Sequence, residues 1–192
     1  MKKYILILTV WLPMLLFSQD SLPKSIIEKL QRAKAEFKVS ENYKTTDIIN
    51  NNQMSYDFAI INKEKKVEIR YTIRPMDSLI IQKKNNPTSI MVDLNIMSKA
   101  NFFAIAHNIS DGIYKTQPIN YDTTSSKKDY NANWGMMILV QPARQFANNY
   151  QNCFFAALHK NDIGDLYIFY LFEDVKDLQS ILIRDSYFLK FE

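Results

Sequence analysis

Glycine is scarce in this chain of 192 residues, which contains only Gly112, Gly135 and Gly164. Loops that wrap around nucleotide phosphates need closely spaced glycines, because only glycine lets the backbone come close to the phosphate groups. Neither the G-x-G-x-x-G pattern nor the P-loop pattern is present. The sequence therefore excludes the two common glycine-rich nucleotide sites.

Cysteine occurs once, as Cys153, and histidine occurs twice, as His107 and His159. A single cysteine forms no disulfide within the chain, so stability has to come from the core. On one strand Cys153 and His159 would lie about 20 Å apart, whereas a nucleophile and its base must be about 3 Å apart. We expect a buried, unreactive thiol. The alternative is a cysteine-dependent hydrolase that pairs Cys153 with the distant His107.

The apolar run at the N-terminus is too short to span a membrane. It extends from Tyr4 to Phe17, which is 14 residues, whereas a spanning helix needs about 20. Two lysines precede the run and Ser18 follows it, which is the layout of a secretory signal peptide. We predict that residues 1–19 are a signal peptide and that the protein is periplasmic or secreted. An uncleaved N-terminal membrane helix is the alternative.

The net charge is small. Loss of the two N-terminal lysines lowers the formal charge of +4 to +2, with acidic and basic residues interspersed. Such a surface offers no electrostatic attraction to nucleic acid or to a membrane. We therefore expect no nucleic-acid partner and no stable membrane insertion after signal cleavage.

The apolar pattern predicts a single α+β domain over residues 20–192. An antiparallel sheet of about five to six strands carries helices packed against its faces, with an N-terminal helix in 20–36 and the sheet core with its helices in 37–192. The predicted elements are a helix at about 23–36, a hairpin within 54–75, a helix at about 88–107, a short strand at about 113–119, strands at 134–141, 153–160 and 166–172, a helix with Val175, Leu178, Ile181 and Leu182 on one face, and a short strand within 186–192.

The alternation of side chains predicts the pairing in the first hairpin. With Ile61 opposite Lys66, charged residues gather on one face, where Asp57 lies opposite Arg70. The second strand ends at Pro75, which cannot donate a ladder hydrogen bond. The apolar face then consists of Met54, Tyr56, Phe58, Ile60, Val67, Ile69, Tyr71 and Ile73.

The second hairpin, within 153–172, is predicted to pair Lys160 with Asp165. Both of its faces are then apolar, which is typical of strands at the centre of a covered sheet. In this register Cys153 and His159 share a face with Phe172, Tyr170, Ile168 and Leu166. We expect His159 to lie in a solvated turn beside Asp165, and His107 to stabilise the end of a helix.

Four residues are candidates for ligand binding. Arg70 and Arg74 lie on one face of a strand, about 13 Å apart, where two guanidiniums can hold an anionic ligand. Their pairing with nearby acids is the alternative. Tyr130 and Trp134 lie beside the loop 113–133, where aromatic rings can stack on a sugar or a peptide, or can simply cover the end of the core. No catalytic residue, metal ligand or cofactor is predicted.

The order helix, hairpin, long connection with a helix, three antiparallel strands and helix resembles the PsbP-like fold. Proteins of that fold include the accessory proteins of the oxygen-evolving photosystem II and exported bacterial relatives. The resemblance covers about residues 37–192, and the helix at 23–36 departs from it. It implies a non-enzymatic accessory role. Our hypothesis is therefore an exported accessory or binding protein with a protein or small-molecule partner in the cell envelope. A carrier of a small apolar ligand is a further alternative, because the chain is rich in aromatic residues and methionine.

Overall fold

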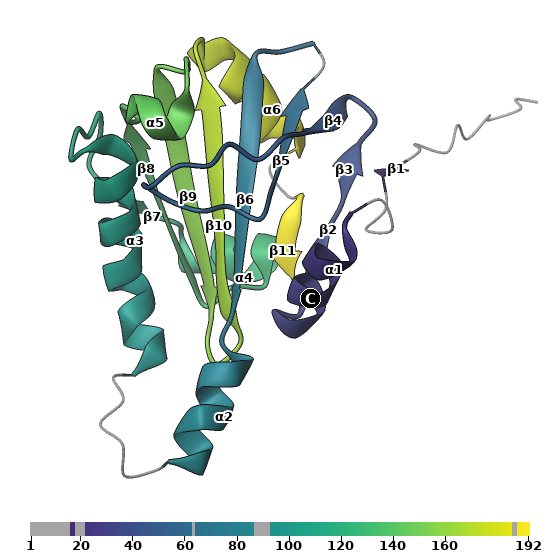
Figure 1. Cartoon of the computed structure of the whole chain (residues 1–192), viewed down its shortest axis with the longest axis vertical. Helices are drawn as coiled ribbons and strands as arrows, with labels where there is room; N and C mark the ends of the chain where they lie inside the picture. Colours follow the sequence, from purple (N-terminus) through teal and green to yellow (C-terminus); the bar gives the residue numbers. More distant parts are fainter. Residues whose placement is uncertain (1–15, 18–21, 63, 87–92, 186–187) are drawn as a thin grey trace, which may run out of the picture.

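The computed structural model describes residues 16–17, 22–62, 64–86, 93–185 and 188–192. These residues form three layers, with an antiparallel sheet between two layers of helices (Figure 1). The α+β class and the single domain are confirmed. The predicted signal segment 1–19 lies outside the described residues, except for the two-residue strand β1, which pairs with β3.

The sheet contains seven strands in the order β4-β5-β6-β10-β9-β8-β7, and every neighbouring pair is antiparallel. The prediction of five to six strands missed the short edge strand β4. A separate two-stranded sheet pairs β2 with β11. The elements in chain order are β1 (Leu16–Phe17), α1 (Lys24–Arg32), β2 (Ala35–Phe37), β3 (Val39–Ser40), β4 (Tyr43–Thr46), β5 (Phe58–Asn62), β6 (Val67–Pro75), α2 (Asp77–Asn85), α3 (Leu94–Ser110), β7 (Ile119–Asn120), α4 (Thr123–Tyr130), β8 (Trp134–Val140), α5 (Arg144–Ala147), β9 (Asn152–Lys160), β10 (Gly164–Phe172), α6 (Val175–Asp185) and β11 (Leu189–Phe191).

The hairpin of β9 and β10 pairs one residue away from the predicted register. Lys160 lies opposite Gly164 and not opposite Asp165, so the loop contains three residues, Asn161 to Ile163. Successive side chains of a strand point to opposite faces. The shift of one residue therefore moves every side chain of β10 to the other face relative to β9.

Asp165 consequently lies opposite His159. The prediction had placed His159 beside Leu166 and in solvent, but its side chain is buried. The residues of β10 that lie opposite Cys153, Phe155 and Ala157 on this face are Leu171, Phe169 and Tyr167.

Gly164 determines how closely β10 approaches β6. A Cβ atom at this position would lie 2.6 Å from the carbonyl oxygen of Arg74, so any side chain would push the two strands apart. In the adjoining loop, Asp162 has a left-handed backbone with φ of 57°, as three-residue hairpin loops commonly require. The Ile163 N–H donates to the Lys160 carbonyl at 3.0 Å and closes the loop.

The hairpin of β5 and β6 is shifted by two residues from the prediction. Ala59, and not Asp57, lies opposite Arg70. Asp57 instead forms an ion pair with Lys29 of α1 and accepts a hydrogen bond from the Ile73 N–H at 2.7 Å. A shift of two residues leaves the faces unchanged. The end of β6 at Pro75 is confirmed.

Two residues of the predicted apolar face lie on the other side of the sheet. Met54 and Tyr56 precede β5, which begins at Phe58. Met54 packs with the residues of α3, and the Tyr56 ring lies against the guanidinium of Arg70. The alternating pattern was therefore extended too far toward the N-terminus.

One face of the sheet, called the α1 face here, is covered by α1, α4, α6 and the β2–β11 pair. Side chains from these elements pack against the sheet in one hydrophobic cluster. Leu178 and Ile181 of α6 are buried there as predicted, whereas Val175 is 50% exposed. The residues contributed by α1 and the small sheet are Ile26, Leu30, Ala35, Phe37, Leu189 and Phe191.

The opposite face, called the α3 face, is covered by α3 and α5 (Figure 1). Phe155 of β9 stacks on Phe102 of α3 at 4.9 Å and on Phe169 of β10 at 4.8 Å between ring centroids. α3 ends at Ser110, and Asp111 adopts a left-handed cap, close to the predicted stop. Residues 88–92 of the predicted helix lie outside the described residues.

Three helical predictions need correction. α1 ends at Arg32, because Lys34 has a φ of 45° and residues 35–37 form a strand. α2 was not predicted, and none of its residues is buried, so it carries no apolar pattern. α4 was predicted as loop, although Asp122 caps it by accepting from the Ser125 N–H at 2.9 Å. No helix in the described part of the chain is both long enough and apolar enough to cross a bilayer.

Candidate functional site

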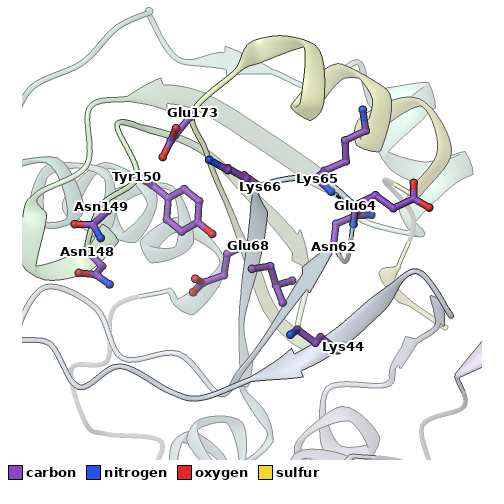
Figure 2. Close-up of a pocket in the computed structure, with 11 residues that line it drawn as sticks. Lys44, Asn62, Glu64, Lys65, Lys66, Glu68, Asn148, Asn149, Tyr150 and Glu173 are labelled. Atoms are coloured by element: carbon purple, nitrogen blue, oxygen red, sulfur yellow. Dashed lines mark hydrogen bonds between the residues drawn. The ribbon is translucent and has the colours of Figure 1, made fainter.

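A cleft of about 510 Å³ lies at the end of the sheet where the β5–β6 loop meets the connection between α5 and β9. Strand β4 and the residue that follows β10 complete its walls (Figure 2). Its side chains are mostly polar, and both charge signs are present. The lining residues are Lys44, Ile61, Asn62, Glu64, Lys65, Lys66, Glu68, Asn148, Asn149, Tyr150 and Glu173.

Glu68 lines this cleft although it is only 7% exposed. It is the second residue of β6 and, like Arg70, points to the α3 face, while Val67 points to the α1 face. The Arg70 Nε donates to the Glu68 carboxylate at 2.6 Å. The pair is buried, so each charge depends on the other for its stability in the core.

Arg70 has further partners that allow its burial. Its Nη1 donates to the carbonyl oxygen of Phe146 in α5. Its guanidinium carbon lies 4.7 Å from the ring centre of Tyr56 and 5.0 Å from that of Phe146. Two aromatic faces, a carbonyl and a carboxylate thus replace part of the hydration that the guanidinium loses on burial, whereas its Nη2 has no hydrogen-bond partner within the described residues. Arg70 fixes Glu68 in the cleft but has no exposed surface of its own.

Tyr150 carries a phenol next to these charges. Burial raises its pKa above the ordinary value, and the negative charge of Glu68 raises it further. Arg70 opposes this shift, and Glu173 adds to it. The hydroxyl therefore stays protonated at physiological pH and can donate a hydrogen bond to a ligand.

Lysines supply the positive charge of the cleft. The side chains of Lys44 and Lys66 are exposed and make no hydrogen bond or ion pair within the described residues. Lys65 forms an ion pair with Asp177 of α6 at 3.1 Å. Two lysines of the cleft wall are therefore free to contact a ligand.

The two loops of the cleft have defined backbones. The side-chain oxygen of Asn62 accepts from the N–H groups of Glu64 and Lys65, both at 2.9 Å. Asn148 has a positive φ of 56°, and its N–H donates to the Arg144 carbonyl at 2.8 Å. Local hydrogen bonds thus hold both walls in place.

The structure separates the two arginines that the sequence placed together. Arg70 is buried, whereas Arg74, at the other end of β6, is exposed. The guanidinium of Arg74 lies 5.7 Å from the ring centre of Tyr167, and its Nη2 is 3.9 Å from the sulfur of Met54. The two guanidiniums therefore form no common exposed surface.

Tyr130 and Trp134 lie away from the cleft. Tyr130 is the last residue of α4; it is buried, and its ring is 5.7 Å from that of Tyr121. Trp134 begins β8, is half-buried, and stacks on the ring of His159 at 5.5 Å. Both rings thus pack against the core.

A buried polar cluster, which the sequence did not predict, surrounds His159. Its Nδ1 lies 2.8 Å from the Asp165 carboxylate, and both side chains are buried. Ser98 of α3 and the Tyr167 hydroxyl both donate to the other oxygen of Asp165 at 3.1 Å. Burial, and then the charge of Asp165, raise the pKa of Tyr167. The three-residue loop before Gly164 is the sequence signal that could have placed His159 opposite Asp165.

The lone thiol, Cys153, is fully buried on the α3 face. Burial raises the pKa of the thiol far above its ordinary value, although the positive charge of Arg70 opposes the shift. His107 lies in the last turn of α3 and is exposed. Within the described ranges, no group of three or more His, Cys, Asp or Glu side chains is arranged to hold a metal ion.

No protein-family model, curated protein or solved structure matches this chain. The interpretation of the cleft therefore depends on its own side chains. Of the features described, the cleft combines an accessible volume with charged groups that lack partners. It is the candidate binding site.

Because Cys153 is buried and its thiol pKa is raised, we expect no reaction with Ellman's reagent in the folded protein. Guanidinium chloride should expose one reactive thiol per chain. As a control, Lys128→Cys in a Cys153→Ala background places a thiol on the exposed side of α4 and should react at once. Rapid reaction of native Cys153 would contradict its burial and revive the cysteine-hydrolase alternative.

Proposed function

We propose that this chain is an exported, non-enzymatic accessory or binding protein that holds a small polar ligand in the cleft above Glu68. The observation that carries the proposal is the buried Glu68 carboxylate at the surface of a cleft of about 510 Å³. Sites for small molecules commonly have volumes of roughly 300–1,000 Å³ and a few fixed polar groups. Glu68 is such a group, because Arg70 holds it in place.

The chemistry of the cleft supports a polar ligand over an apolar one. Ile61 is the one aliphatic residue among the described lining residues, which otherwise carry charges, amides or a phenol. A carrier of apolar molecules needs an apolar cavity. The buried apolar side chains instead pack against one another in the two core layers.

A binding role without catalysis is supported by the environments of Cys153 and Glu68. Cys153 is enclosed between the sheet and the α3 layer, with a raised thiol pKa, whereas a reactive cysteine is accessible and has a lowered pKa. Glu68 accepts a hydrogen bond from the Arg70 guanidinium, which fixes its carboxyl group in place. These features suit recognition of a ligand.

The proposals of export and of a PsbP-like fold are supported by the sequence features of the chain. Two lysines, the apolar run and Ser18 support a signal peptide. The order of hairpin, long connection with a helix, three strands and helix supports the PsbP-like fold. Members of that fold mostly assist other proteins, which supports an accessory role.

Ligand binding can be tested by NMR with the ¹⁵N-labelled protein. The probes are L-alanine, citrate, ethanolamine, glucose and inorganic phosphate, with laurate as the apolar comparison. We expect at least one polar probe to shift the amide signals of residues 64–66 and 148–150, because these residues line the cleft. Lys66→Gln should weaken binding of any anionic probe about tenfold, whereas Lys128→Gln on α4 should leave it unchanged. Shifts caused by laurate alone, or only at other residues, would contradict the proposal.

Export can be tested by fractionating cells that produce the chain. The protein recovered from the periplasm or the medium should begin at Gln19 or Asp20, because the predicted cut follows Ser18 or Gln19. N-terminal sequencing measures this directly. Recovery of the protein in the cytoplasm, with Met1 retained, would rule out export.

A further inference from the structure

The strand register fixes the distance between the backbone positions of two oppositely charged residues of the cleft. Lys44 of β4 lies opposite Ile61 of β5, and Ile61 lies opposite Glu68 of β6. Residues that lie directly opposite each other in an antiparallel sheet point to the same face. Neighbouring strands are about 4.8 Å apart, so the Cα atoms of Lys44 and Glu68 are about 10 Å apart.

These two charges do not neutralise each other. Lys44 makes no ion pair within the described part of the chain, and the one hydrogen bond that Glu68 accepts through its side chain there comes from Arg70. A carboxylate has about four acceptor positions. Glu68 can therefore hold a second cationic group at the cleft surface. The cleft thus has an exposed lysine on one side of Ile61 and a largely buried carboxylate that borders it on the other.

Further polar side chains line the end of the cleft that contains Glu68. The Tyr150 phenol borders the cleft near Glu68, and Figure 2 shows these two side chains next to each other, with Glu173 on the other side of Tyr150 and Lys44 farther along the cleft. Asn148 and Asn149 add two side-chain amides to the same wall. Amide side chains donate to carbonyls and accept from N–H groups, as a peptide backbone requires.

We propose that the cleft binds a short peptide with free ends, with its ammonium group at Glu68 and its carboxylate at Lys44. This inference deepens the proposed function and depends on it. An extended chain spans at most about 3.3–3.6 Å per residue, so three residues cover about 10 Å. A tripeptide therefore matches the spacing of the two Cα atoms, and its middle residue lies over Ile61.

Isothermal titration calorimetry with trialanine tests the proposal. N-acetyltrialanine lacks the ammonium group and trialanine amide lacks the carboxylate, so each should bind at least about tenfold more weakly than trialanine. Lys44→Gln should weaken the binding of trialanine about tenfold but should leave the already weak binding of trialanine amide unchanged. Lys128→Gln is the matched control, because it removes an exposed lysine outside the cleft, and it should change neither affinity.

Lys44 is an exposed residue of an edge strand, so its replacement should not unfold the protein. Circular dichroism of the variant checks this point. Glu173→Gln tests the proposed site of the ammonium group. It should weaken the binding of trialanine but not that of N-acetyltrialanine. Glu28→Gln on α1 is the exposed control.

The outcomes separate this inference from the proposed function. Equal binding of trialanine and its blocked forms, or no effect of Lys44→Gln, would overturn the peptide assignment. Failure of trialanine to bind while another polar probe shifts the cleft signals would also overturn it, but would leave the polar binding function standing. If no polar probe, trialanine included, shifts the amide signals of the cleft, both proposals are wrong.

Discussion

The buried ion pair between Glu68 and Arg70 is the interaction on which both the core and the cleft depend. A charge without a partner in a protein interior costs several kcal/mol, so Arg70 needs all of its neighbours at once. Tyr56 comes from the segment before β5, and Phe146 comes from α5, far away in sequence. Arg70 therefore ties β6 to the segment before β5 and to the distant helix α5. It also explains why a carboxylate stands in an almost completely buried position at the cleft surface.

The positions of strands and helices could be predicted where the spacing of apolar residues indicated one kind of element. The long apolar runs gave β8, β9 and β10 within one or two residues of their bounds. Their register could not be read in the same way, because β9 and β10 are apolar on both faces and a slip of one residue leaves the pattern unchanged. The observed register goes with the three-residue loop Asn161 to Ile163, and Gly164 after it packs closely against the backbone of β6. α2 buries no side chain, so no pattern marked it.

The candidate site was less predictable, because its residues come from separate parts of the chain. Arg70 alternates with Val67 and Ile69 in a way that suggested an exposed charged face. Only the packing of α5 on that face shows that Arg70 is covered. Lys44 lies on a strand that was not predicted, and the strand register places it two strands away from Glu68, with Ile61 between them. Cys153 was different, since its burial followed from the apolar strand that carries it.

A double-mutant cycle on Glu68 and Arg70 tests most directly whether this pair organises the molecule. Urea unfolding of Glu68→Gln, Arg70→Met and the double variant gives the coupling free energy between the two side chains. The exposed pair of Arg32 and Asp77, with atoms 2.8 Å apart, serves as the comparison and should give at most about 1 kcal/mol. We predict a coupling of about 2 kcal/mol or more for Glu68 and Arg70. A coupling below about 0.5 kcal/mol would contradict the account.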